Sequence, residues 1–301
     1  MNKQLQGSLM VLIAGTAWGI SGVSGQYLMA HGMNVNLLTS LRLLISGLVL
    51  TLMAYLGQRE RFKQMLKSPK TMVGIVLFSL LGLLMNQYAY LNAIKETNAG
   101  TATVLQYVTP ILILAYVCLK SRQRPSLIEL VAIVMAILGT YIMATHGQFN
   151  QLAITPLGLF WGLASAVTYS LYILIPAKLI AEWGSLIIIG PAMLVGGVAF
   201  PIFTQSWQYP LDLAPRNLLA LFGIIVIGTL FAYTVFLKGT TIVGPVKGSL
   251  FASVEPIASV FFAVLIMKES FYAIDFLGML LIILAVVLIS LKDLMALNRN
   301  I

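Results

Sequence analysis

The residue best placed to do chemistry is Glu255, a carboxylate near the middle of the apolar run 243–266. An ionised side chain at the centre of a bilayer costs about 2.5–3.5 kcal/mol or more, so such a residue normally faces a cavity and a partner. Glu255 could therefore bind a proton or a cationic group of a substrate, and titrate during a transport cycle. The alternative is a structural carboxylate that fixes helix packing through hydrogen bonds.

Two further charged residues, Arg42 and Lys247, also lie inside apolar runs. Arg42 could hold an anionic substrate group, pair with a carboxylate, or extend to the membrane surface, and a structural role is favoured. Lys247 lies near one end of its run and could extend to the surface in the same way. A direct ion pair with Glu255, two helical turns away, would require a bend. Both residues remain candidates for binding a charged group or for coupling transport to an ion.

Two prolines, Pro110 and Pro256, interrupt apolar runs near their middle. Each lacks an N–H group and frees the carbonyl of the residue four positions earlier, which is Gln106 or Ala252. An unpaired carbonyl at this depth is tolerated only against protein or a water-filled cavity. Each proline is therefore a hinge beside a substrate path, or else a static kink repaired by neighbouring helices.

Polar and aromatic residues surround these prolines. One face of the fourth span holds positions 103, 106, 107 and 110. One face of the ninth span holds positions 249, 252, 253 and 256. Trp18 and Tyr169 fall near mid-membrane, away from the interfaces where such rings concentrate. Together they could line a cavity for an amino acid or an organic cation, although helix packing would also explain them. The candidate substrate-binding residues are Trp18, Gln87, Tyr90, Gln106, Tyr107, Tyr169, Tyr172, Tyr233, Ser249 and Ser253.

Other kinds of chemistry are disfavoured by what the sequence contains. The single cysteine, Cys118, and the two histidines, His31 and His146, offer no clustered metal ligands. There is no Ser/His/Asp set and no phosphate-binding loop. The net charge of +9 does not indicate nucleic acid, because the basic residues flank apolar runs. We therefore expect no enzyme, no catalytic residue, no metal, no cofactor and no nucleic-acid partner.

The elements that must position these residues are membrane-spanning helices. The 301 residues are 59% hydrophobic and only 9% charged, so lipid must solvate most of the surface. A span needs about 20 mostly apolar residues. Ten such runs occur, which predicts an all-α polytopic membrane protein: 7–29, 36–56, 71–93, 98–119, 126–145, 155–177, 184–204, 217–238, 243–266 and 272–291.

Basic residues predict the orientation of these spans. With the N-terminus in the cytoplasm, thirteen lysines and arginines fall in or next to cytoplasmic connections and three in outer ones. Ten is an even number, so the C-terminus is expected in the cytoplasm as well. The expected location is the cell membrane, either plasma or inner, with lipid as a partner.

The chain contains an internal repeat. A shift of 146 residues places Gly82 on Gly228, Thr103 on Ser249, Pro110 on Pro256 and Glu129 on Asp275, and a shift of about 151 places Trp18 on Tyr169. The repeats are expected at 1–147 and 152–301, with five spans each. Because five is odd, the second repeat must enter the membrane from the opposite side, and such inverted repeats are typical of secondary transporters with a site near mid-membrane.

The chain resembles the EamA-like family of the drug/metabolite transporter superfamily. The resemblance rests on Trp18–Gly19, on the run LTSLR that ends at Arg42, on TATVLQYVTPILILAY in the fourth span, and on GSLFASVEPIASVFFAVLIMKES, which holds Glu255–Pro256 and Glu269. The first repeat has Gln123 where Glu269 recurs. The resemblance implies a ten-helix secondary transporter of small metabolites, often an exporter of amino acids or similar compounds.

The expected function is therefore secondary active transport of amino acids, amines or related metabolites. Alternating access would carry the substrate outward, and protons are candidate coupling ions. The alternatives are a membrane channel and a lipid-modifying membrane protein.

Overall fold

The computed structural model describes residues 3–122, 124–148 and 152–299. Within these ranges every regular element is a helix, which confirms the predicted all-α class. Ten single helices or runs of two or three consecutive helices are long and apolar enough to cross a membrane, so the ten predicted spans are confirmed.

Five spans are interrupted where one helix passes into the next. In chain order the spans are α1 (Lys3–Ala30); α2 (Val35–Gly57); α4, η1 and α5 (Pro69–Leu77, Phe78–Leu84, Met85–Glu96); α6 and α7 (Ala99–Gln106, Thr109–Ser121); α8 (Leu127–Thr145); α9 and α10 (Pro156–Leu174, Ala177–Trp183); α11 (Ser185–Thr204); α12, η3 and α13 (Pro215–Phe222, Gly223–Phe231, Ala232–Val243); α14 and α15 (Pro245–Ala252, Val254–Met267); and α16 (Ala273–Arg299). Two short helices, α3 (Arg59–Leu66) and η2 (Ser206–Gln208), lie in connections.

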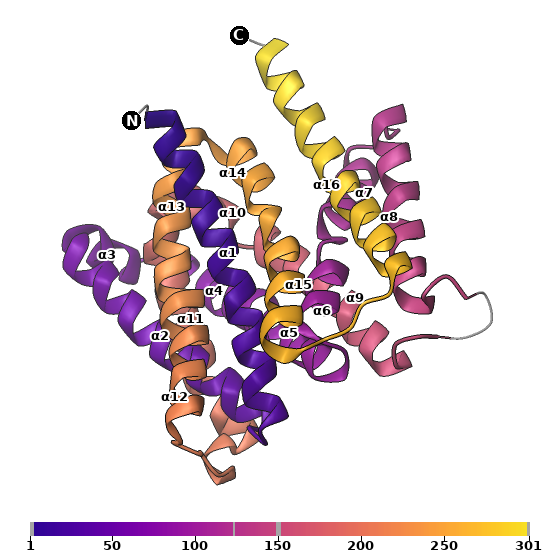
Figure 1. Cartoon of the computed structure of the whole chain (residues 1–301). Helices are drawn as coiled ribbons and strands as arrows, with labels where there is room; N and C mark the ends of the chain where they lie inside the picture. Colours follow the sequence, from indigo (N-terminus) through magenta and orange to yellow (C-terminus); the bar gives the residue numbers. More distant parts are fainter. Residues whose placement is uncertain (1–2, 123, 149–151, 300–301) are drawn as a thin grey trace.

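Two helices of the first repeat pack on their own counterparts in the second. Helix α2 packs along α11, and α8 packs along α16 (Figure 1). Glycines allow the close approach. A Cβ atom added at Gly47 would lie 2.4 Å from the backbone nitrogen of Leu194, and one at Gly139 would lie 2.6 Å from the carbonyl oxygen of Gly278. Contact between counterparts is the arrangement that a twofold axis in the membrane plane produces, so the fold fits the predicted inverted repeat.

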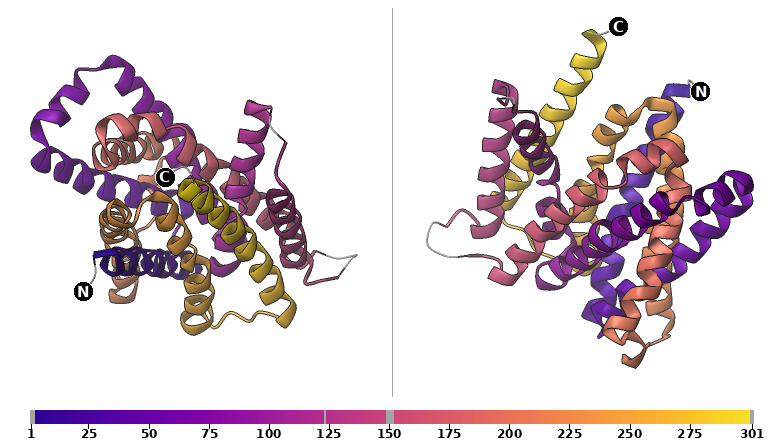
Figure 2. Two further views of the ribbon diagram at one scale, coloured as in Figure 1. Left: turned by 90° about the horizontal axis from the view of Figure 1, so that it is seen from above. Right: turned by 180° about the vertical axis from the view of Figure 1, so that it is seen from behind.

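Helix α1 joins the first repeat to the second through small residues. A Cβ at Gly15 would lie 2.7 Å from a methyl of Val254, and one at Gly19 would lie 2.7 Å from the Cβ of Ala258. The long α1 therefore packs directly on α15, close to Glu255. Both chain ends lie at the same end of the bundle, as an even number of spans requires (Figures 1 and 2).

Matching positions of the two repeats carry π-helical segments, which the hydropathy pattern did not predict. These are η1 in the third span and η3 in the eighth. A shift of 146 places 78–84 on 224–230, and it places Gly82 on Gly228. A π-helical turn often marks a functional position, because it releases backbone groups from the regular pattern.

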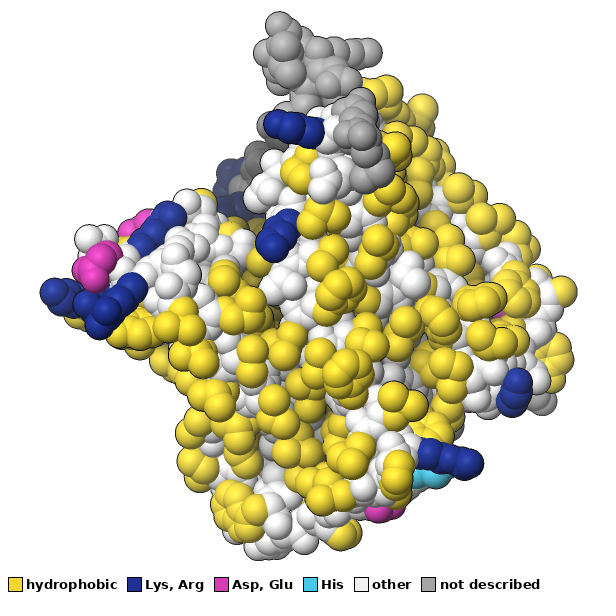
Figure 3. Space-filling view, turned by 60° about the vertical axis from the view of Figure 1, so that its left-hand side comes forward, with side chains coloured by type: hydrophobic (Ala, Val, Ile, Leu, Met, Phe, Trp, Pro, Cys, Tyr) yellow, Lys and Arg dark blue, Asp and Glu magenta, His cyan; other side chains and the backbone are white. Residues whose placement is uncertain are grey.

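The surface fits a lipid environment. On the face shown in Figure 3, hydrophobic side chains cover the broad middle, and the lysines, arginines and acidic residues lie toward its edges. Large apolar side chains such as Leu56, Phe203 and Leu219 are exposed there or elsewhere on the molecule. The protein is thus a multi-pass membrane protein whose hydrophobic surface would be covered by lipid.

Candidate substrate site

The two proline-interrupted spans meet at Tyr107 and Glu255. Tyr107 directly follows α6 in the first repeat, and Glu255 lies in the first turn of α15 in the second. The Tyr107 hydroxyl lies 3.1 Å from Glu255 Oε2 and 2.9 Å from the carbonyl oxygen of Ala252. Glu255 is half-buried. A carboxylate from one repeat is therefore held by a side chain from the other.

Both carbonyls that the prolines were predicted to free accept hydrogen bonds from hydroxyl groups. Ala252 O accepts from Tyr107, and Gln106 O accepts from Thr109 at 2.7 Å. Thr109 also lies within hydrogen-bond distance of Ala166 O in α9, at 2.9 Å. The helices break at 107–108 and at 253, just before Pro110 and Pro256. Side chains thus satisfy the backbone groups that each break exposes.

Arg42 points into the protein. Its side chain is only 6% exposed, and its Nε donates to the Thr229 hydroxyl at 3.1 Å. Thr229, on the π-helical η3, in turn donates to Ile224 O, five residues earlier, at 2.9 Å. Arg42 therefore joins α2 of the first repeat to η3 of the second and does not extend to the membrane surface.

Aromatic residues form a continuous group around this centre. Trp18 meets Tyr233 edge-on with ring centroids 5.6 Å apart, and the Tyr172 hydroxyl donates to that of Tyr233 at 3.1 Å. Tyr169 stacks on Tyr172, also at 5.6 Å. The repeat counterparts Trp18 and Tyr169 thus belong to one aromatic group. Tyr90 stands nearby and shares a 2.6 Å hydrogen bond with Thr103.

Arg42 and Glu255 are each held by the other repeat. Arg42 of the first repeat donates to Thr229 of the second, and Tyr107 of the first repeat lies 3.1 Å from Glu255 of the second. No ion pair joins Arg42 to Glu255 within the described part of the chain.

The two predicted glutamines differ in their partners. Gln106 donates to Asn86 at 3.0 Å. Gln87 is 5% exposed and makes no hydrogen bond to any residue that the structure describes. Asn86 and Thr229 were not among the predicted site residues. Thr229 could have been suspected, because it follows Gly228, the repeat counterpart of Gly82.

Some predicted residues are not brought to this centre. Lys247 is exposed on α14 and forms no ion pair with Glu255 among the described residues. Ser253, by contrast, does lie beside this centre, buried at the break between Ala252 and α15. The side chain of Ser249 and the whole of Gln123 lie outside the described part of the structure. No group of three potential metal ligands occurs in the described ranges.

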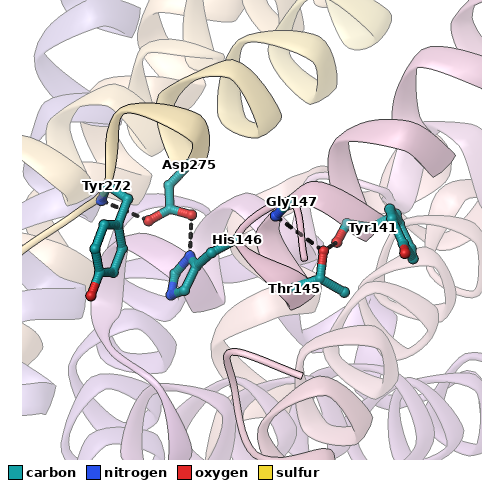
Figure 4. Close-up of polar contacts among 6 residues, drawn as sticks. All are labelled: Tyr141, Thr145, His146, Gly147, Tyr272 and Asp275. Atoms are coloured by element: carbon teal, nitrogen blue, oxygen red, sulfur yellow. Dashed lines mark hydrogen bonds and ion pairs between the residues drawn. The ribbon is translucent and has the colours of Figure 1, made fainter. Parts of the chain in front are cut away.

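Two contacts tie the repeats together at the end of the bundle away from the termini. Gln26 donates to Glu269 Oε1 at 2.5 Å and accepts from the backbone N–H of Ala99 at 2.9 Å. His146 bonds Asp275, which also accepts from the backbone N–H of Tyr272 (Figure 4). A cavity of about 240 Å³ lies beside these residues, lined by residues such as Glu96, His146 and Phe271.

Comparison with known proteins agrees with this architecture. Residues 5–145 and 156–291 each match the EamA-like transporter family. The chain is 37% identical to the uncharacterized inner membrane transporter YicL of Salmonella typhimurium, over 97% of this chain and 98% of that protein. It is 25% identical to the uncharacterized transporter YwfM of Bacillus subtilis, over 94% and 93%. It is 23% identical to a WAT1-related protein of Arabidopsis thaliana, over 89% and 85%.

One solved structure, described only as a crystal structure of a protein, has the same fold. Its TM-score is 0.63 at 16% sequence identity, and the likeness covers 96% of both chains. The matched segments, the ten spans and the relatives agree, and the chain belongs to the EamA-like transporter family.

Proposed function

We propose that this protein is a secondary active transporter that exports small metabolites, such as amino acids, amines or related compounds, by alternating access. The observation that carries the proposal is that two charged residues inside the bundle, Arg42 of the first repeat and Glu255 of the second, are each hydrogen-bonded to a residue of the other repeat. Charges are retained inside a membrane bundle chiefly where they serve a substrate or ion path.

Alternating access requires two states of similar energy, and inverted repeats supply them by symmetry. We divide the repeats at 1–147 and 152–301. The Gln26–Glu269 contact ties the repeats together at the end away from the termini, and it would help to close that end. We assign that end to the outside of the cell, because the basic residues favour cytoplasmic termini. Breaks before Pro110 and Pro256 would let α7 and α15 move relative to α6 and α14.

Coupling to protons is supported by the hydrogen count at Tyr107. One hydroxyl hydrogen faces two acceptors, Ala252 O and Glu255 Oε2. An ionised Glu255 competes with Ala252 for that hydrogen, whereas a protonated Glu255 can donate to the Tyr107 oxygen while Tyr107 donates to Ala252. A change in the protonation of Glu255 would therefore rearrange the contact between the repeats.

Flux in proteoliposomes tests the proposal. Purified wild-type protein should show saturable uptake, stimulation by unlabelled substrate on the opposite side, and faster flux under a proton gradient. Glu255→Gln should remove most of the gradient-driven part while protein abundance stays near that of wild type. A channel would show no stimulation from the opposite side. Full transport by Glu255→Gln with an unchanged pH profile would exclude Glu255 as the coupling group.

A further inference from the structure

A short helix in a connection presents a row of basic side chains. Helix α3 (Arg59–Leu66) joins the second span to the third, so it lies at the same membrane surface as the N-terminus, and it projects from the side of the bundle (Figures 1 and 2). Four-residue spacing places Arg59, Lys63 and Lys67 on one side of α3 and its C-terminal cap. Lys70 follows in the first turn of α4. These four residues are called the basic stripe.

The other sides of α3 are held by the protein, which fixes the direction of the basic stripe. Phe62 and Met65 are buried, and the Phe62 ring meets Tyr55 edge-on with centroids 5.8 Å apart. Arg61 Nη2 donates to the carbonyl oxygen of Glu182 at 2.6 Å, at the end of α10 in the second repeat. The helix is therefore anchored through its apolar side and through Arg61, and the stripe is left facing outward.

Little negative charge balances the basic stripe. Glu60 is the only acidic residue in the sequence before Glu96. It pairs with Lys63 at 3.1 Å on the surface, where such a pair contributes little. The other three cations of the stripe have no carboxylate within ion-pair distance among the described residues. The stripe therefore keeps a net positive charge that an external anion can neutralise.

Arg59 is oriented to receive a phosphate group. Its Nε donates to the Tyr55 hydroxyl at 3.1 Å, and its guanidinium carbon lies 5.6 Å from the centre of that ring. The Nη atoms make no hydrogen bond to the part of the protein described here. A guanidinium held in this way can donate two parallel hydrogen bonds to a phosphate, while neighbouring lysines add point charges.

Apolar side chains beside the basic stripe indicate which kind of anion fits. Leu56 is 72% exposed, Leu66 48% and Val73 60%, and they lie just before, within and just after the segment that holds the stripe. Basic residues that flank exposed apolar side chains next to a span match a lipid, whose headgroup and acyl chains contact the two kinds of side chain together. A soluble phosphate would leave the apolar side chains uncovered.

We propose that the basic stripe is a docking site for an anionic phospholipid, with the phosphate at Arg59 and the acyl chains along Leu56 and Leu66. The lipid belongs to the leaflet at the end of the bundle that holds the chain termini. The site lies on the outside of the bundle, so it stands independently of the proposed substrate and direction of transport.

The test compares two lipids with identical acyl chains on the purified protein in a neutral detergent. Phosphatidylglycerol is anionic and phosphatidylcholine is net neutral. Native mass spectrometry should show that wild type retains phosphatidylglycerol about tenfold more strongly. Thermal unfolding should shift upward with phosphatidylglycerol only. High salt should reduce both effects, because exposed charges are screened. Inorganic phosphate at millimolar concentration should give no thermal shift.

Variants assign the preference to the basic stripe. The triple variant Arg59→Gln/Lys63→Gln/Lys67→Gln should lose most of the tenfold preference. The matched control removes the same charge from exposed positions at the same membrane surface, through Lys120→Gln, Arg124→Gln and Lys238→Gln, and should keep the preference. Size-exclusion profiles confirm folding. If the triple variant does not fold, the pair Lys67→Gln/Lys70→Gln replaces it, since both side chains are exposed.

Three outcomes would overturn the lipid site. The first is equal retention of the two lipids by wild type. The second is an equal loss of preference in the stripe variant and the matched control, which would assign the effect to net charge. The third is a thermal shift with inorganic phosphate as large as that with phosphatidylglycerol, which would make the occupant a soluble anion.

Discussion

His146 binds Asp275 across the interface of α8 and α16, and the repeat counterparts of these two residues bind each other at the opposite end of the same interface. The shift of 146 places His146 on Lys292 and Glu129 on Asp275. Lys292 Nζ lies 2.5 Å from Glu129 Oε1. Both acids also accept a backbone N–H at the start of their helices, Glu129 from Ser126 and Asp275 from Tyr272. The two contacts hold α8 and α16 together at both ends (Figure 4 shows the histidine end).

Loss of either contact should weaken the interface between the repeats. Asp275→Asn removes the charge that faces His146 and should lower the free energy of unfolding by about 1–3 kcal/mol, because Asp275 is buried. His146→Lys copies the counterpart residue and should be tolerated. Melting of the purified protein in detergent measures both changes. An Asp275→Asn protein as stable as wild type would show that the His146–Asp275 contact contributes nothing to the stability of the protein.

Removal of the Tyr107 hydroxyl should destabilise the centre and alter transport together. Tyr107→Phe removes the hydroxyl that Ala252 O and Glu255 Oε2 share, which should lower the free energy of unfolding by about 1–3 kcal/mol. The pH dependence of flux should also shift, because the partner of Glu255 is lost. Tyr116→Phe on the exposed face of α7 is the control. An unchanged pH profile in Tyr107→Phe would show that the Tyr107 hydroxyl takes no part in coupling transport to protons.

Close packing of α2 on α11 should not tolerate an added methyl group. In Gly47→Ala the new Cβ would lie 2.4 Å from the backbone nitrogen of Leu194, so the helices must separate, at a cost of about 1–3 kcal/mol. Gly57→Ala is the matched control, because nothing lies within 4 Å of a Cβ there. Thermal unfolding of both variants gives the comparison. Equal stability of the two would mean that the helices adjust without strain.

Breaking the Gln26–Glu269 contact should open the end of the bundle away from the termini. In Gln26→Ala both the carboxylate of Glu269 and the N–H of Ala99 lose their partner. A cysteine at position 87, in a Cys118→Ser background, should then react faster with a membrane-impermeant thiol reagent added outside intact cells. Ser8→Ala is a control at the other end of α1. Labelling that stays at the parent rate would exclude this contact as an outer closure.

Much of the framework follows from residues that are local in the chain. The ten spans were predicted from apolar runs, and the matched prolines predicted that the carbonyls of Gln106 and Ala252 would lose their helical donors. The hydroxyls that replace those donors were not predicted. Thr109 lies in the same span as Gln106, just past the helix break, whereas Tyr107 reaches Ala252 from the other repeat, 145 residues away. Arg42 was predicted as a candidate for binding a charged group or for coupling. Its partner Thr229 was not predicted, because the sequence of η3 is that of an ordinary apolar helix.

The sequence by itself determined the number of spans, their class and the inverted repeat. In lipid every backbone group must be satisfied within its own segment, so each helix is encoded by its own run of residues. Tertiary structure alone decided which side chains meet: Tyr107 with Glu255, Arg42 with Thr229, and His146 with Asp275. Those contacts depend on how far each helix is rotated and shifted against its neighbour. Small residues such as Gly47 and Gly139 set that register through close packing, which no single segment specifies.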